Sequence, residues 1–172
     1  MDQTGTYAPQ LGSYLIDRGY QVTITALHPK LFTLSDRGIS QEEIKKRFEE
    51  ILVNTSKEQD KKVLNYFLIF LKKGGKIEVK IPEEKDIADE IKEGRPLGAL
   101  LTSNFLKGNK PRFNFHFNVL IGIEDDKIIV NDPSWNECGG ENTYNVRDFL
   151  YGLYASAFGD LDNACLIKIK RN

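Results

Sequence analysis

The sequence predicts one α+β domain in which helices pack against a mainly antiparallel sheet. Most helical patterns precede residues 113–135, where two apolar runs flank an acidic turn and predict a β-hairpin. Helices followed by hairpins are typical of the α+β class, and parallel sheets instead alternate strand and helix. The 172 residues are enough for one ordinary domain with a substantial core.

The helices are predicted from capping residues and apolar spacing. Ser40 and Glu43 form a capping box at the start of a helix that ends near Asn54. Thr6 is expected to cap the first helix, because its hydroxyl can accept hydrogen bonds from unpaired amides. The predicted helices are, in order, residues 6–18, 40–54, 56–71, 83–93 and 146–154.

The strands are predicted from alternation and from one continuous apolar run. Residues 21–26 and 76–81 alternate polar and apolar side chains, as half-buried strands do. Residues 97–102 are apolar throughout and predict a central strand, and residues 165–169 predict a closing strand. The segments 103–112 and 133–140 are rich in Gly, Pro and Asn and are expected to be loops.

Composition restricts the classes of function. The chain is 40% hydrophobic and 28% charged, with a net charge of −1, so it has no basic footprint for nucleic acid or anionic membrane. No run approaches the ~18 apolar residues of a membrane span. Two cysteines and no secretion signal favour reduced thiols, so we expect a cytoplasmic protein that binds neither nucleic acid nor membrane. The sequence leaves the oligomeric state open.

The predicted hairpin brings two functional side chains together. His116 opens its first strand and Asp132 closes the second, and side chains alternate faces with period two. With an odd-length loop centred on Glu124, His116 lies directly opposite Asp132, with about 4.5–5.5 Å between the Cβ atoms. A two-residue turn at Asp125 and Asp126 would place the pair on opposite faces. We expect the odd loop.

His116 and Asp132 are the predicted catalytic residues. A histidine held by a carboxylate is the base half of a nucleophilic triad, because the carboxylate fixes the imidazole tautomer and stabilises the imidazolium. The alternative is an ordinary strand histidine followed by an ordinary Asp-Pro turn. Chemistry alone leaves both open.

The hairpin also carries a resemblance to a known family. The segment His-Phe-Asn-Val-Leu-Ile-Gly-Ile, followed after the turn by Lys-Ile-Ile-Val-Asn-Asp-Pro, resembles the His-to-Asp segment of papain-like cysteine peptidases. It is most similar to the double-glycine leader peptidases of bacteriocin exporters, weakly over residues 5–31 and better over residues 83–170. The resemblance implies a papain-like cysteine proteinase fold over residues 1–172, with a helical insert at about 40–73. It also implies peptide-bond hydrolysis or acyl transfer on a peptide or protein substrate.

The resemblance further implies a cysteine nucleophile and an oxyanion-hole glutamine that precede the aligned segments. Neither cysteine maps onto that role: Cys138 follows the hairpin, and Cys165 lies in the closing strand as an expected structural thiol. We therefore expect the chain as given to be inactive as a cysteine peptidase. Three interpretations remain: a peptidase whose nucleophile is encoded upstream of Met1, a degenerate domain that binds peptides or a protein partner, and a generic α+β domain.

Three further expectations concern the surroundings of the hairpin. Trp135 and the loop to Gly140 either cover Asp132 or form a simple aromatic turn. His28, in a His-Pro sequence, has no partner at a ligand-like spacing and is expected to be a turn residue. Two isolated histidines and two distant cysteines give no ligand spacing, and no phosphate-binding loop is present, so we expect neither a metal nor a cofactor.

Overall fold

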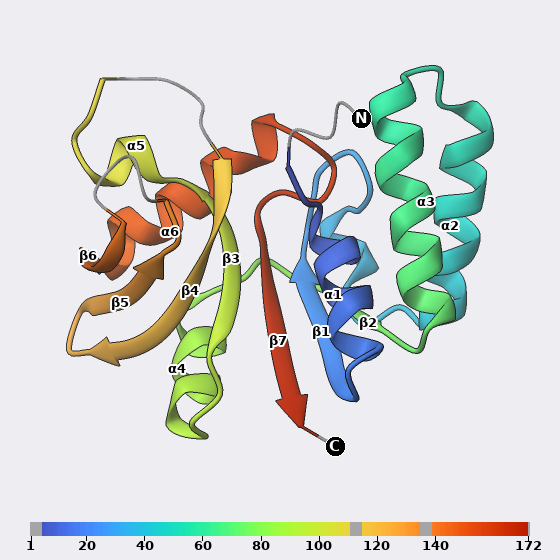
Figure 1. Ribbon diagram of the computed structural model, residues 1–172. Helices are drawn as coiled ribbons and strands as arrows, with labels where there is room; N and C mark the ends of the chain where they lie inside the picture. Colours follow the sequence, from blue (N-terminus) through green and yellow to red (C-terminus); the bar gives the residue numbers. More distant parts are fainter. Residues whose placement is uncertain (1–4, 111–114, 135–138, 172) are drawn as a thin grey trace.

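A seven-stranded mixed sheet organises the chain (Figure 1). The computed structural model describes residues 5–110, 115–134 and 139–171. The strand order is β2-β1-β7-β3-β4-β5-β6, and among the described strands only β1 and β2 pair in parallel. The strands are β1 (Tyr20–Ala26), β2 (Lys76–Val79), β3 (Leu97–Thr102), β4 (Phe115–Glu124), β5 (Lys127–Asp132), β6 (Gly140–Asn145) and β7 (Cys165–Arg171).

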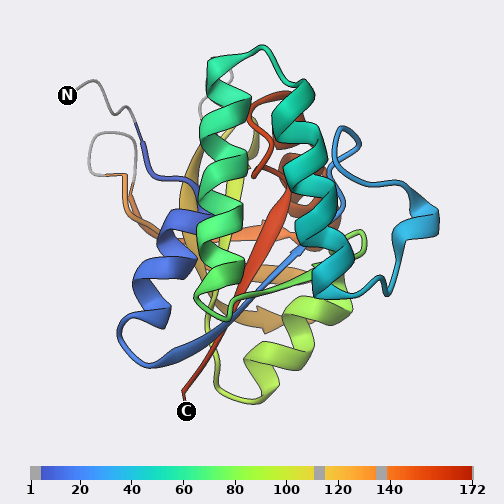
Figure 2. The same cartoon turned by 90° about the vertical axis from the view of Figure 1, so that its right-hand side faces the viewer.

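Helices cover both faces of this sheet and confirm the α+β class. They are α1 (Ala8–Ile16), α2 (Gln41–Asn54), α3 (Glu58–Lys72), α4 (Glu84–Lys92), α5 (Ser103–Leu106) and α6 (Val146–Ala155), with short 3-10 turns η1 (Leu34–Asp36) and η2 (Ser156–Phe158). Parallel neighbours need a crossover connection, which α2 and α3 supply between β1 and β2. Figure 2 shows these two helices side by side in front of the sheet.

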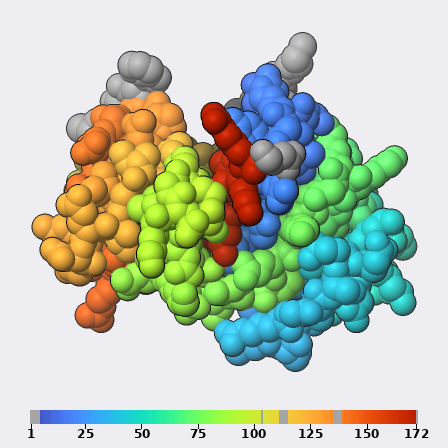
Figure 3. All heavy atoms as spheres, turned by 90° about the horizontal axis from the view of Figure 1, so that it is seen from below, coloured from blue at the N-terminus to red at the C-terminus, as the bar shows by residue number. Residues whose placement is uncertain are grey.

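Each face of the sheet carries its own hydrophobic core. The first core joins α1, α2 and α3 to β1, β2 and β7, with Ile24, Phe48 and Phe70 fully buried. The second joins α4 and α6 to β3, β4 and β5 around Leu120 and Phe149. Because side chains alternate along a strand, β7 contributes to both cores. Seen from below, α2 (cyan) and the β4–β5 hairpin (orange) lie on opposite sides of the molecule, with α4 (yellow-green) between them (Figure 3).

The predicted helices and strands lie within a few residues of the observed ones, but three local predictions are wrong. Tyr7, not Thr6, occupies the N-cap position of α1, and the Ala8 amide donates instead to Asp162 Oδ2 at 2.6 Å. The predicted loop 103–112 begins with the short helix α5, and residues 140–145, for which no strand was predicted, form β6.

The start of α2 confirms the predicted capping box. The Glu43 amide donates to Ser40 Oγ at 3.2 Å, and the Ser40 amide donates to Glu43 Oε2 at 2.8 Å. These bonds satisfy amides that the first helical turn leaves unpaired. Within the described ranges, no helix combines the length and the apolar character needed to cross a membrane.

Candidate functional site

The imidazole of His116 and the carboxylate of Asp132 are in direct contact. His116 Nε2 lies 2.7 Å from Asp132 Oδ1, so the ring N–H donates to the carboxylate. The Asp132 side chain is fully buried, and the His116 side chain is 23% exposed. The predicted contact between the ends of β4 and β5 is therefore confirmed.

The predicted loop and register of this hairpin are wrong. Glu124 pairs with Lys127, so the turn has two residues, and Asp125 takes the left-handed conformation (φ 51°) that two-residue hairpin turns require. Such a turn alone would separate the pair. A β-bulge between Leu120 and Gly122 adds one residue to β4 and shifts the register by one. The shift returns both side chains to one face.

The contact runs diagonally across the two strands. Val119 pairs with Asn131, and this register continues to place Asp132 across from Asn118, with His116 two residues further along β4. Diagonal neighbours remain within reach of long side chains. Asn118 is fully buried, and its Nδ2 donates to the His116 carbonyl at 3.3 Å. Asn118 was missed from the sequence, because an asparagine in an apolar run reads as an exposed strand residue.

Lys107 is a third member of the site that sequence reasoning missed. Its Nζ donates to Asp132 Oδ2 at 2.6 Å, and its side chain is only 8% exposed. Lys107 directly follows α5, the helix that the sequence did not predict. A lysine before a glycine in an apparent loop reads as an ordinary solvated charge, so no local signal identified it.

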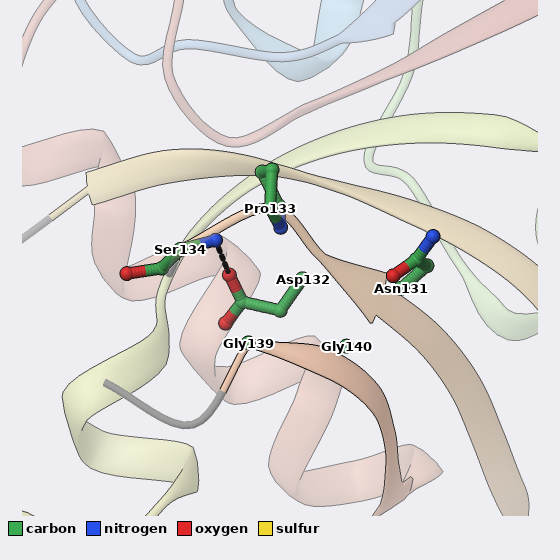
Figure 4. Close-up of a pocket in the computed structure, with 6 residues that line it drawn as sticks. All are labelled: Asn131, Asp132, Pro133, Ser134, Gly139 and Gly140. Atoms are coloured by element: carbon green, nitrogen blue, oxygen red, sulfur yellow. Dashed lines mark hydrogen bonds between the residues drawn. The ribbon is translucent and has the colours of Figure 1, made fainter. Parts of the chain in front are cut away.

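Three donors hold the Asp132 carboxylate. The Ser134 amide donates to Oδ1 at 2.9 Å, beside the bond from His116, as Figure 4 shows for Ser134. Burial opposes ionisation of Asp132. The Lys107 ammonium, the Ser134 amide and His116 outweigh it and hold the pKa of Asp132 below its ordinary value. Asp132 is therefore a buried carboxylate that stays ionised at neutral pH.

A pocket of about 500 Å³ lies beside Asp132 (Figure 4). Asn131, Pro133 and Ser134 form one wall, and Gly139 and Gly140 form the other. The described lining includes Asp132 but not His116, which reaches the same carboxylate from β4. The predictions for Trp135 and Cys138 lie outside the described residues.

The remaining candidate residues lie away from this site. Cys165 is fully buried at the start of β7, and burial raises the pKa of its thiol well above the ordinary value, which fits the predicted structural thiol. His28 opens a turn, as predicted, because its carbonyl accepts from the Leu31 and Phe32 amides, but the burial of its side chain was not predicted. It is 2% exposed, its Nδ1 accepts from the Lys30 amide at 3.2 Å, and its Nε2 donates to the Ala157 carbonyl at 3.1 Å.

Among the described residues, no group of three or more His, Cys, Asp or Glu side chains could hold a metal ion. Comparisons of the chain with models of protein families, with curated proteins and with solved structures give no match. The chemistry of the site must therefore be argued from its own geometry.

Proposed function

We propose that His116 and Asp132 are the base half of a nucleophilic site that hydrolyses or transfers acyl groups of peptide substrates, as in papain-like cysteine peptidases. The observation that carries this proposal is the 2.7 Å bond between His116 Nε2 and the buried, ionised Asp132. Such a carboxylate fixes the ring orientation and stabilises the positive charge that forms when the imidazole accepts a proton. With Nε2 held by Asp132, Nδ1 is the nitrogen that accepts the proton.

The nucleophile in this proposal is a thiol other than Cys165. A thiol attacks as thiolate, and Cys165 has no exposed surface and a raised pKa. Cys138 lies outside the described residues, and the resemblance gives it no role. His116 must therefore be tested as a general base in a reaction that does not require a thiol nucleophile.

The base is tested with an activated ester, p-nitrophenyl acetate, whose hydrolysis needs no thiol. We expect His116→Gln to lower the rate about 10²-fold, the low end of general-base effects. His28→Gln is the matched control, because the chain has two histidines and each variant retains one. Equal rates for wild type and His116→Gln would refute the proposed base.

A panel of double-glycine peptides tests the thiol. We expect no cleavage by the 172-residue chain through a cysteine mechanism, and Cys165→Ala is the control for loss of a buried thiol. Cleavage that disappears in Cys138→Ala and in His116→Gln would make Cys138 the nucleophile and contradict the expected inactivity.

The Lys107 ion pair favours a second function, a degenerate domain that binds peptides or a protein partner. Lys107 neutralises the carboxylate at 2.6 Å within a buried setting, and this reduces the stabilisation that Asp132 offers to an imidazolium. Lys107→Met separates the two functions. A catalytic pair should gain ester hydrolysis at alkaline pH in this variant, because the Asp132 carboxylate, no longer neutralised by Lys107, better stabilises the imidazolium that forms when His116 accepts a proton. Saturable peptide binding with ester rates equal to His116→Gln would favour the degenerate domain.

A further inference from the structure

The strand β6 forms one edge of the sheet. It pairs with β5 along its whole length, and among the described strands it has no neighbour on its other side. The side chains of Glu141 and Thr143 are exposed, and the strand contains neither proline nor lysine. Natural edge strands usually carry such residues to prevent pairing with other chains.

The hydrogen-bonding phase of β6 shows which backbone groups point outward. In an antiparallel pair, residues that bond to the neighbouring strand alternate with residues whose N–H and C=O point away. The Val146 amide donates to the Asp126 carbonyl at 2.7 Å. Tyr144, two residues earlier and paired with Ile128, therefore also directs its backbone N–H and C=O towards β5. Glu141 and Thr143 therefore direct their backbone groups away from β5. No hydrogen bond recorded among the described residues reaches these groups.

The other edge of the sheet is protected. At β2, the Ile77 amide donates to Gln41 Oε1 at 2.8 Å, and Gln41 Nε2 donates to the Ile77 carbonyl at 2.8 Å. One side chain thus occupies the position that a further strand would take. The same fold closes one of its edges with a glutamine, and the described part of the chain places no strand on the other edge, at β6.

The open edge leads directly to the candidate site. Gly140, the first residue of β6, pairs with Asp132, and both line the pocket of about 500 Å³. A chain paired with Glu141 and Thr143 runs past Gly140 into that pocket. Only an extended backbone offers alternating donors and acceptors at the spacing of these groups.

We propose that the edge of β6 binds an extended segment of the substrate polypeptide as an eighth strand and directs it into the pocket beside Asp132, a role that rests on the proposed function. Glu141 favours a positively charged side chain at the position opposite it in the added strand. Main-chain bonds supply affinity in this mode, so the bound segment is selected for extended conformation more than for one sequence.

The probe is a fluorescein-labelled peptide, acetyl-Val-Lys-Val-Lys-Val-Gly-Gly-amide, and its binding is followed by anisotropy. Thr143→Pro removes an outward N–H that β5 does not use, and we expect it to weaken binding at least tenfold. Thr143→Val keeps the N–H and is expected to bind as wild type does. Urea midpoints of both variants establish that they are folded.

Two peptides with the same sequence test the mode without altering the protein. One is N-methylated at the first, third and fifth residues, and the other at the second and fourth. An added strand uses one set of amides, so only one methylated peptide should lose affinity, and amide exchange at Glu141 and Thr143 should slow when the parent peptide binds. No saturable binding of the parent peptide, or equal affinity of both methylated peptides, would overturn strand addition. Binding is measured without turnover, so a failure of ester hydrolysis in His116→Gln comparisons remains distinguishable from a failure here.

Discussion

Asp132 and Asp162 are equally buried, each 2% exposed, yet their acidities shift in opposite directions. Asp162 Oδ2 accepts from the Ala8 amide, and Oδ1 finds no donor among the described residues. Burial therefore dominates and raises the pKa of Asp162 to about 7. Asp132 has Lys107, Ser134 and His116 as donors, and its pKa falls below the ordinary value.

The comparison shows that the donors around a buried carboxylate, and not its burial, decide whether it is charged. Asp132 accepts hydrogen bonds from two side chains, one on β4 and one directly after α5, and these favour its ionised form. Asp162 has a raised pKa, and its carboxyl group joins the start of α1 to the turn before β7. The first setting suits a catalytic or ion-paired role, and the second couples folding to pH.

The largest expected effect comes from removing the carboxylate of Asp132, which Lys107 and His116 share as a hydrogen-bond acceptor. Asp132→Ala removes the carboxylate that pairs with the buried Lys107 ammonium at 2.6 Å, and we expect a loss of about 3–5 kcal/mol in the free energy of unfolding. Urea denaturation measures it. The double variant Asp132→Ala/Lys107→Met should recover most of the loss, because no buried charge remains. If the double variant is as unstable as the single one, packing rather than charge explains the cost.

The second prediction concerns Asp162 and pH. Its pKa is raised from 3.8 to about 7 on folding, so its contribution to stability is complete below about pH 4 and is lost as pH rises to about 7. At ~1.4 kcal/mol per pKa unit, the loss amounts to at most about 4 kcal/mol. Asp162→Asn keeps an acceptor for the Ala8 amide and cannot ionise, so it should be more stable than wild type at pH 8. Parallel stability curves for both proteins between pH 4 and 8 would contradict the raised pKa.

His28 provides a smaller test, because the Ala157 carbonyl and the Lys30 amide, both backbone groups, hold its buried ring. His28→Ala leaves the Ala157 carbonyl and the Lys30 amide without their partner, and we expect a cost of about 1–3 kcal/mol. Burial lowers the pKa of His28, so its contribution is complete above about pH 6.5 and is lost as pH falls through the lower value. Thermal unfolding at pH 7 and pH 5 should show His28→Gln losing less than wild type on acidification.

Much of the fold could be predicted from the sequence because local signals agree with tertiary packing. The Ser40–Glu43 capping box, the alternation in β1 and the apolar run of β3 each specify their own element. β6 could not be predicted, since Gly-Glu-Asn-Thr-Tyr-Asn is a strand only through its pairing with β5. Thr6 was predicted to cap α1, but the carboxylate of Asp162, far along the chain, accepts from the first amide of that helix instead.

The residues of the candidate site also fall into those that the sequence predicted and those that it did not. The contact between His116 and Asp132 was predicted although the turn and the register were wrong, because the unpredicted bulge in β4 offsets the change of face that the two-residue turn causes. Lys107 and Asn118 could not be predicted, since nothing local marks a lysine or an asparagine as buried. Their positions follow from how α5 and β3 pack against the hairpin, which is a property of the whole chain.

The bulge between Leu120 and Gly122 makes this site sensitive to the length of the chain between its two residues. Losing or gaining one residue in β4 turns His116 to the opposite face of the sheet, away from Asp132. Losing or gaining two moves it about 7 Å along the strand but keeps it on the same face. Insertions and deletions, more than substitutions, therefore limit how this hairpin can vary.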